Sequence, residues 1–341
     1  MYLTTGSPLK GRQLENLKRF LGSCNLDYDE SIGFTAVLME EDEIVATGSL
    51  DGGTIKCVAV SPAHQGEDAA SQVMTALLAR ASEQGIQHLM LYTKPQNQYI
   101  FSSFGFHPVI RTADCLLMEN RRDGLKRFLM ELDKPKDDNG PVGCVVANCN
   151  PFTYGHRYLI ETAARECAWV HVFVLSENRG MFTPGERMKM VKDGCGDLKN
   201  VIIHPTGPYM VSSATFPNYF IKDKLRTNDI HCEMDVRLFA EKIAPELSVS
   251  RRYVGTEPEC AVTGKYNERM RAMLPSCGIE LIEIERRENR GRAVSASHAR
   301  GLIQNKQWNE LMELLPDSSM KVICAKEGEE SWLIHSACSE I

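Results

Sequence analysis

One segment of this chain combines a short apolar run, a tight turn and the start of a helix. This order of features restricts the fold that the chain can adopt. Residues Gly143–His156 read G-C-V-V-A-N-C-N-P-F-T-Y-G-H, and the apolar run covers Cys144–Ala147. Asn148, Asn150 and Pro151 interrupt the run before the helix begins. In α/β sheets, a buried strand followed by such a turn presents the backbone N–H groups of the helix start to an anion. The segment therefore predicts an α/β fold with an anion site at this turn.

The first turn of that helix carries polar groups suited to a polyphosphate. Thr153 offers a hydroxyl, Gly155 allows a ligand to approach the backbone, and His156 offers an imidazole donor. We predict that His156 and Thr153 stabilise the charge that builds up on phosphate during a reaction, and thus act catalytically. The alternative is purely local: both side chains could serve only to cap the helix.

A second segment has a similar composition near the end of the chain. Arg292–Arg300 reads R-A-V-S-A-S-H-A-R and precedes the apolar pair Leu302 and Ile303. Ser295 or Ser297 is a candidate N-cap, and Arg300 follows about one helical turn later. Hydroxyls and a guanidinium at a helix start form a phosphate clamp. We expect the two segments to close on one ligand from opposite sides.

Strand and helix patterns alternate through the second part of the chain. This alternation predicts a parallel, doubly wound sheet, in which ligands bind beyond the carboxyl ends of the strands. The expected strands are Val142–Ala147, Val170–Leu175, Val201–His204, Tyr253–Gly255 and Glu280–Ile284. The expected helices are Gly155–Cys167, Pro184–Gly194, Tyr219–Leu225, Val236–Lys242, Val262–Met273 and Ser297–Gln304.

The first part of the chain has a different order of elements, which predicts a separate α+β domain. A polar, breaker-rich stretch between Glu131 and Gly140 divides the two, so we expect domains at 1–132 and 140–341. The expected elements of the first domain are helix Gly11–Cys24, strands Ile32–Met39, Glu43–Leu50 and Thr54–Val60, helix Ala69–Gln84, strand Leu89–Thr93 and helix Asn97–Phe104.

Bulk properties exclude several classes of function. A net charge of −6 gives no electrostatic reason to bind nucleic acid broadly. The chain has no apolar run of about 20 residues and no signal-peptide pattern at its start, so we expect a cytoplasmic protein without a membrane partner. Its 12 cysteines are scattered without a C-x-x-C pair, which favours free thiols and predicts no metal site.

The T-Y-G-H and S-A-S-x-x-R motifs resemble those of the nucleotidyltransferase superfamily, which has [H/T]-x-G-H and I-S-S-T-x-x-R-like motifs. Val294, Ala296 and Ser297 are conservative departures from the second motif. Glu257 follows another predicted strand and is a candidate for contact with ribose, or with magnesium through water. The resemblance implies an ATP site. Its residues would be Asn150, Pro151, Thr153, Gly155, His156, Glu257, Ser295, Ser297 and Arg300.

The order of elements in the first domain resembles the GNAT acetyltransferase fold. Gln65–Ala70 lies where that family has its [Q/R]-x-x-G-x-[G/A] pyrophosphate loop, but Asp68 replaces the central glycine, and its carboxylate would repel a pyrophosphate. The resemblance implies that Gln65, Gly66, Ala70 and Asn97 contact a coenzyme A-like arm. The domain would either bind an acyl carrier differently from the family or serve as a recognition module.

The two domains in this order resemble the citrate lyase ligase family over nearly all 341 residues. The resemblance implies ATP and Mg²⁺ as cofactors and acetate as the substrate that is adenylated with release of pyrophosphate. The acetyl group would then pass to the thiol of the phosphoribosyl-dephospho-CoA prosthetic group on the acyl carrier subunit of citrate lyase, and so activate the lyase.

Three other interpretations stay open at this point. A nucleotide transferase would act on a phosphate acceptor, and would need a further cation cluster that the sequence does not reveal. An inactive regulator would only bind a nucleotide or a coenzyme A-like ligand. An RNA-modifying acetate ligase shares the nucleotide domain, but the additional domain and the acidic balance count against it.

Overall fold

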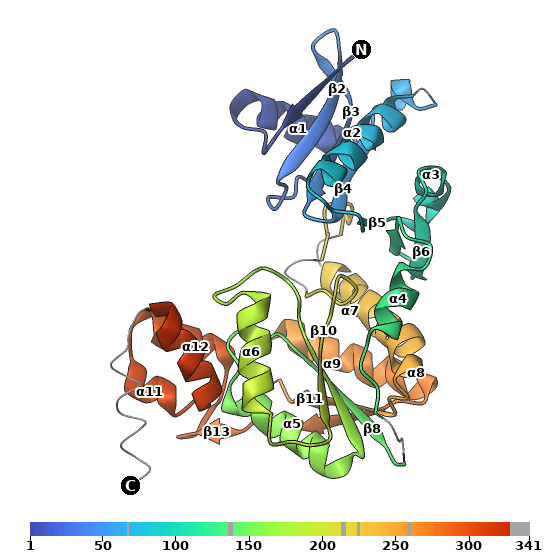
Figure 1. Ribbon diagram of the computed structural model, residues 1–341. Helices are drawn as coiled ribbons and strands as arrows, with labels where there is room; N and C mark the ends of the chain where they lie inside the picture. Colours follow the sequence, from blue (N-terminus) through green and yellow to red (C-terminus); the bar gives the residue numbers. More distant parts are fainter. Residues whose placement is uncertain (67, 136–138, 213–215, 224–225, 258–260, 328–341) are drawn as a thin grey trace. The chain divides into compact units, whose positions relative to one another are not determined.

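The computed structural model describes residues 1–66, 68–135, 139–212, 216–223, 226–257 and 261–327. The chain divides into two compact units (Figure 1), and each is described by itself. The first unit contains Met1–Phe128 and Phe216–Met234, and the second contains Leu129–Thr215 and Asp235–Ile341. In the described residues, no helix combines the length and the apolar character needed to cross a membrane.

The first unit is built on a seven-stranded sheet in the order β1-β2-β3-β4-β5-β7-β6. All neighbouring strands run antiparallel except β4 and β5, which are parallel. The strands are β1 Tyr2–Gly6, β2 Phe34–Glu40, β3 Glu43–Asp51, β4 Thr54–Val60, β5 Met90–Thr93, β6 His107–Arg111 and β7 Leu116–Glu119. The helices of this part of the chain are α1 Gly11–Ser23, α2 Ala69–Glu83, α3 Gln98–Ser103 and α4 Gly124–Met130, and the last two residues of α4 belong to the second unit.

The core of the first unit forms where helix α2 covers the sheet. Val73, Met74 and Leu77 of α2 are fully buried and belong to one cluster with Leu38 of β2 and Ile55 of β4. Apolar residues that recur every three or four positions place one face of α2 on the strands, and burial of that face stabilises the unit.

The second unit holds a five-stranded parallel sheet in the order β10-β9-β8-β11-β12. Its strands are β8 Val142–Ala147, β9 Trp169–Val174, β10 Val201–Pro205, β11 Arg251–Gly255 and β12 Glu280–Ile284, with a small hairpin of β13 Glu288–Asn289 and β14 Arg292–Ala293. Its helices include α5 Tyr154–Glu166, α6 Pro184–Gly194, α8 Ala244–Glu246, α9 Ala261–Met273, α10 Ala296–Gln304, α11 Trp308–Met312 and α12 Asp317–Glu327, while α7 spans Thr227–Leu238.

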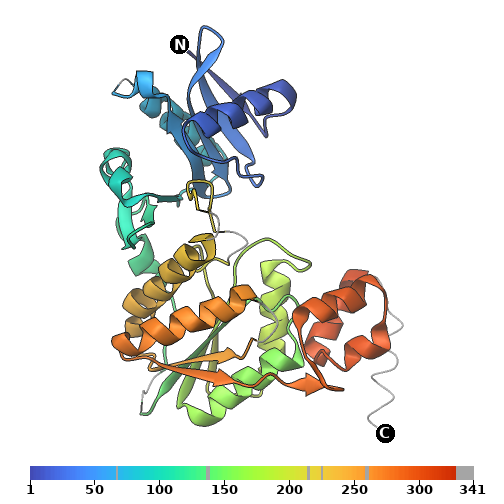
Figure 2. The ribbon, with the colours of Figure 1, turned by 180° about the vertical axis from the view of Figure 1, so that it is seen from behind.

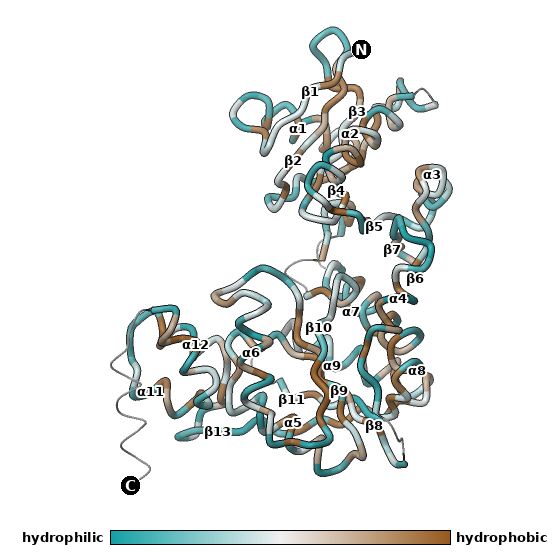
Figure 3. Tube along the Cα trace, viewed as in Figure 1, coloured by the Kyte–Doolittle hydropathy of each residue, from teal (hydrophilic) through white to brown (hydrophobic). Residues whose placement is uncertain are grey.

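Helices cover both faces of this parallel sheet. Helices α5 and α6 lie on one face, and α9 lies on the other (Figures 1 and 2). Strand β9 is strongly apolar and appears brown in Figure 3, because a strand covered on both faces has no solvent side. The strand order reverses at β8, so the loops after β8 and β11 meet at the carboxyl edge of the sheet. The doubly wound fold predicted from the sequence is present.

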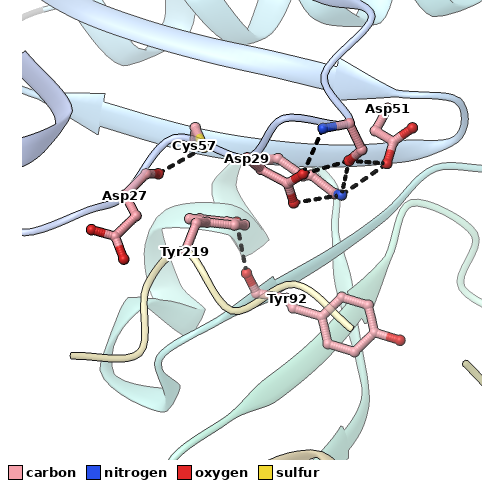
Figure 4. A network of polar contacts seen from close by, with 8 residues as sticks. Asp27, Asp29, Asp51, Cys57, Tyr92 and Tyr219 are labelled. Carbon is pink, nitrogen blue, oxygen red and sulfur yellow. Dashed lines mark hydrogen bonds and ion pairs between the residues drawn. The ribbon is translucent and has the colours of Figure 1, made fainter. Parts of the chain in front are cut away.

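One element predicted from the sequence is wrong. The helix expected over 219–225 is absent from its described residues: 219–223 form turns and bends, and 224–225 lie outside the described part. Tyr219 and Phe220 are buried against the sheet of the first unit, where the Tyr219 hydroxyl donates to the carbonyl oxygen of Tyr92 (Figure 4). Packing against residues that are distant in the sequence therefore determines the conformation here, and it overrides the local preference for a helix. Strands β1, β6 and β7 and helix α4 were not predicted, because these elements are short and their patterns are weak.

Candidate active site

A cavity of about 510 Å³ lies in the second unit, in the size range of small-molecule binding sites. Residues from four separate segments line it, and they follow β8, β11 and β12 or begin α10. The segments that contain Thr153 and Arg300 therefore face the same space. The lining residues are Thr153, Gly155, His156, Tyr158, Leu159, Gly255, Glu257, Thr263, Ile284, Glu285, Arg286, Arg287, Val294, Ser295, Ala296, Ser297 and Arg300.

Helix α5 begins at the cavity with a reciprocal capping box. The Thr153 hydroxyl accepts a hydrogen bond from the backbone N–H of His156, at 3.3 Å. In return, Nδ1 of His156 accepts from the backbone N–H of Thr153, at 3.1 Å. These bonds satisfy two N–H groups of the first turn and fix the imidazole in place. Both the local capping role and a position on the cavity are thus observed for this pair.

The capping bond decides which nitrogen of His156 carries the proton. Because Nδ1 accepts a hydrogen bond from a backbone N–H, the proton of the neutral ring is assigned to Nε2, which becomes a donor. Burial, followed by the positive charge of Arg286, lowers the pKa of His156 to about 4. At neutral pH the side chain is therefore a neutral N–H donor.

Helix α10 brings a second set of donors to the cavity. Ser295 is its N-cap, and the Ser295 hydroxyl accepts from the backbone N–H of His298 at 3.2 Å. The Arg300 guanidinium donates from Nη1 to the carbonyl oxygen of Asn150 at 2.7 Å and from Nη2 to the Ser297 hydroxyl at 2.8 Å. Two helix starts, α5 and α10, thus meet at one cavity, and each contributes partial positive charge.

Two arginines of the cavity were missed from the sequence. Arg286 donates from Nε to the carbonyl oxygen of Thr256 at 2.8 Å and forms an ion pair with Glu257. Arg287 lies over the ring of Tyr154, with its guanidinium carbon 5.1 Å from the ring centroid. Both arginines closely follow strand β12, on the edge where ligands bind in such sheets. That position was the signal that could have identified them.

Glu257 has a different environment from the one expected. Its side chain is only 5% exposed and is paired with Arg286, while it still lines the cavity. The pair removes much of the repulsion that an unpaired carboxylate would exert on phosphate. Among the described lining residues, the arginines Arg286, Arg287 and Arg300 outnumber the carboxylates Glu257 and Glu285, so this part of the lining favours an anion.

Asn150 and Pro151 are in the turn but are not among the lining residues. Asn150 is buried, and its side-chain oxygen accepts from the backbone N–H of Phe182 at 3.1 Å. Arg187 is fully buried and donates to the carbonyl oxygens of Asn148 and Glu177. These residues hold the loops after β8 and β9, so their observed contacts are those of positioning groups.

The residues expected to contact a coenzyme A-like arm are only partly together. Gln65 and Asn97 line a separate cavity of about 300 Å³ in the first unit, whereas Gly66 and Ala70 do not. Asn97 donates from its side-chain nitrogen to the Thr93 hydroxyl at 3.1 Å, which holds it beside β5. Among the described residues of the 65–70 loop, only Gln65 lines this cavity.

The cysteines form no disulfides within the described residues. The ten cysteines of the described residues are free thiols, and most are buried; Cys260 and Cys338 lie outside that part. Within the same part, no group of three or more His, Cys, Asp or Glu side chains is placed to hold a metal ion.

Both parts of the chain match known protein families. Residues 142–323 match the family described as "Citrate lyase ligase C-terminal domain", and residues 12–133 match "Acetyltransferase (GNAT) domain". The citrate (pro-3S)-lyase ligase of Klebsiella pneumoniae is 37% identical over 314 residues, which cover 91% of this chain and 92% of that protein. The corresponding ligase of Escherichia coli strain K12 is 36% identical over 313 residues, covering 90% and 89%. That of Haemophilus influenzae is 37% identical over 320 residues, covering 92% and 95%.

Proposed function

The chain belongs to the citrate lyase ligase family, and from this premise we propose that it is an ATP-dependent ligase that acetylates and thereby activates citrate lyase. The observation in support is the cavity of the second unit, where two helix starts and three arginines converge. The proposed substrates are ATP and acetate, and the proposed acceptor is the thiol of a coenzyme A-like prosthetic group on the acyl carrier subunit of the lyase.

The first step would be adenylation of acetate. A carboxylate oxygen of acetate attacks the α-phosphorus of ATP, the bond from that phosphorus to the bridging oxygen breaks, and pyrophosphate leaves. Negative charge increases on the phosphate oxygens as the reaction proceeds, so fixed donors around them lower the barrier. His156 Nε2–H, the Thr153 hydroxyl and Arg300 are the donors we assign to this task.

A neutral histidine suits this role. Because its pKa is lowered to about 4, His156 keeps its donor proton throughout the neutral range without the cost of a buried charge in the free protein. Its ring is held by Thr153 before any ligand binds, so little reorganisation is required when phosphate arrives. Asn150 and Pro151 would act indirectly, by shaping the turn.

The second step would transfer the acetyl group to the thiol. The sulfur attacks the carbonyl carbon of the acetyl-adenylate, the bond to the phosphate oxygen breaks, AMP leaves and the thiol proton passes to solvent. We assign recognition of the prosthetic arm to the first unit, with Gln65 and Asn97 at its cavity. Gly66 and Ala70 do not line this cavity, so we assign them no direct contact with the arm.

Magnesium is proposed to arrive with the nucleotide. Mg²⁺ partly neutralises ATP, which allows a second anion to approach, and it is commonly bound through substrate phosphates. Glu257 could contact it through water only if its pair with Arg286 loosens, so a contact with ribose is the simpler assignment. Free thiols in the described part agree with the proposed cytoplasmic location.

One experiment tests the adenylation directly. The protein is incubated with ATP, Mg²⁺, acetate and hydroxylamine, which traps an activated acyl group. We expect equal amounts of pyrophosphate and acetohydroxamate, and neither product without acetate. A nucleotide transferase acting on a phosphate acceptor would give no hydroxamate, and an inactive regulator would give neither product. Either result would refute the proposal.

A further inference from the structure

Strand β8 is the central strand of the parallel sheet, and the backbone turns sharply where it ends. Asn148 is exposed directly after the strand, and the next residue, Cys149, is buried with a left-handed φ of 51°. Such a conformation is unfavourable for a residue other than glycine, and it persists where the surrounding contacts hold it. One residue further on, the carbonyl oxygen of Asn150 accepts the hydrogen bond from Arg300.

Arg187 of α6 is packed against this end of β8. Its side chain is fully buried, although a guanidinium is rarely buried unless it is paired. Nη1 donates to the carbonyl oxygen of Asn148 at 3.1 Å and to Oδ1 of the same residue, and Nη2 donates to the carbonyl oxygen of Glu177. These acceptors are neutral, and Nε has no hydrogen-bond partner among the described residues. The bonds of Arg187 therefore do not neutralise its buried charge, which lies next to Asn148.

The bond to Arg187 fixes which way the Asn148 amide faces. A guanidinium can only donate, so the atom of the carboxamide that meets it must be the oxygen. The amide nitrogen of Asn148 then points away from Arg187, and it has no hydrogen-bond partner in the described part of the chain. Because Asn148 is exposed, its amide N–H groups are available to a ligand.

This amide lies near the place where phosphate is proposed to bind. Consecutive Cα atoms are about 3.8 Å apart, so the Cα atoms of Asn148 and Asn150 are separated by at most about 7.6 Å. Asn150 holds Arg300 through its carbonyl oxygen, and Thr153 caps helix α5 three positions later. A small molecule bound to the Asn148 amide is therefore close to a phosphate held by Arg300.

The chemistry of the amide suits a small carboxylate that has to react. A neutral amide donates to one carboxylate oxygen and leaves the other oxygen free to attack phosphorus. An exposed guanidinium would instead engage both oxygens in a bidentate pair. Because Arg187 is buried, it attracts the anion through its charge and polarises the Asn148 amide without binding the carboxylate itself.

From this geometry we propose that the side-chain amide of Asn148 binds the carboxylate substrate, and that Arg187 is a positioning residue which acts through Asn148. The proposal rests on the proposed function, because that function supplies acetate. It adds a binding group for the acyl substrate, since Asn148 is not among the residues that line the cavity of Thr153 and Arg300.

The test is steady-state formation of acetohydroxamate by the full-length protein, with acetate and ATP varied in turn. Asn148→Asp keeps an oxygen for Arg187 but replaces the amide nitrogen with a second carboxylate oxygen, which repels acetate. We expect the KM for acetate to rise about 30-fold or more, and the KM for ATP to change by less than about threefold. Asn148→Ala removes the donor without adding charge, and it should raise the KM for acetate about 10-fold.

Asn309→Asp is the matched control, because Asn309 is exposed on α11 and does not line the cavity. It should have the KM values of the unaltered protein. An unchanged KM for acetate in the Asn148 variants would overturn the proposal. A rise confined to the KM for ATP would also overturn it, because the amide would then belong to the nucleotide site. If the unaltered protein forms no hydroxamate, the proposed function itself fails.

Arg187→Lys tests the positioning role. Lysine keeps the charge but cannot hold the Asn148 side chain and both carbonyl oxygens in one plane. If Arg187 acts through Asn148, the substitution raises the KM for acetate about fivefold in the unaltered protein and has little further effect in Asn148→Ala. Equal rises in the two backgrounds would show that Arg187 does not act through Asn148.

Discussion

Arg300 and Asn150, 150 positions apart in the sequence, are joined by a hydrogen bond of 2.7 Å from the guanidinium to the backbone carbonyl. The bond links the turn after β8 to the first turns of α10. Together with the bond to Ser297, it uses two of the five N–H donors of Arg300 and sets the plane of the group. A ligand that enters the cavity therefore meets a guanidinium whose orientation is already fixed.

Arg300→Lys should lower the rate of acetate adenylation by about 10-fold to 100-fold with folding retained. Lysine keeps the positive charge but cannot bond Asn150, Ser297 and a phosphate in one plane, and one charged hydrogen bond is worth about 1.5–3 kcal/mol. The measurement is acetate-dependent pyrophosphate exchange. Arg292→Lys, at an exposed position of β14, is the control and should behave like the unaltered protein. Equal activity of both variants would remove Arg300 from the site.

His156→Ala should reduce adenylation by about 10²-fold or more, in the range for loss of one charge-stabilising donor. Because its pKa is lowered to about 4, His156 should also produce no inflection in kcat/KM for ATP between pH 5.5 and 8. His298→Ala removes another histidine of the α10 start that does not line the cavity, and it should retain activity. An inflection near pH 6.5 that disappears only in His156→Ala would contradict the neutral-donor role.

Arg286→Gln should raise the pKa of His156 from about 4 toward 6.5. Burial is the larger cause of the low value and remains, so the rise is partial; the positive charge that also disfavours imidazolium is removed. Titration of the imidazole by NMR measures the change. Arg271→Gln, which breaks the more exposed pair with Glu283, is the matched control and should leave the His156 pKa unchanged. The same value in both variants would show that Arg286 does not act on His156.

Local sequence was sufficient for the elements that position the cavity, and insufficient for the contacts between distant segments. The β8 strand and the α5 start follow from an apolar run, a turn and a capping threonine, all within about a dozen residues. The parallel order follows from alternation, so the meeting of the Thr153 and Arg300 segments could be expected. Their roles in catalysis, and the division at 132–140, stay predictions.

Tyr219 shows what such patterns cannot reveal. A helix was expected over its segment, yet the aromatic side chains of that segment pack on a sheet whose residues lie more than a hundred positions earlier in the sequence. Hydrogen bonds between residues so far apart in the sequence form only when the sheet is assembled, so they leave no periodic pattern in the sequence. Arg286 is an intermediate case. Its position just after β12 could be predicted from the sequence, but its ion pair with Glu257 could not.

The buried pair of His171 and His204 should make stability depend on pH. Nδ1 of His171 lies 2.9 Å from Nε2 of His204, and burial is the main cause that lowers the pKa of each to about 4. In the unfolded chain both titrate near 6.5. The unfolded state therefore gains protons first as the pH falls, and the pair's stabilising contribution, complete above about pH 6.5, is lost as the pH falls toward 4.

Urea unfolding at pH 7 and pH 5 measures this effect. Each histidine should lower the free energy of unfolding at pH 5 by about 1–2 kcal/mol relative to its value at pH 7. Replacing both with asparagine, which hydrogen-bonds but does not titrate, should make the drop between the two pH values smaller by about 2–4 kcal/mol, the sum of the two contributions. An unchanged drop would mean that the acid sensitivity arises elsewhere, for example from paired carboxylates.

Gly155→Ala tests how closely the two helix starts must approach. A Cβ at this position would lie 3.0 Å from the carbonyl oxygen of Val294 and 3.4 Å from the Thr153 hydroxyl, so the backbone before α10 would have to shift. We expect adenylation to fall by about 10-fold or more, because small displacements of catalytic groups are costly. Gly185→Ala is the control: it lies in the first turn of α6 with open space around its Cβ, so the variant should be active and as stable or slightly more stable. If Gly155→Ala is as active as Gly185→Ala, the close approach of Gly155 to Val294 is not required for catalysis.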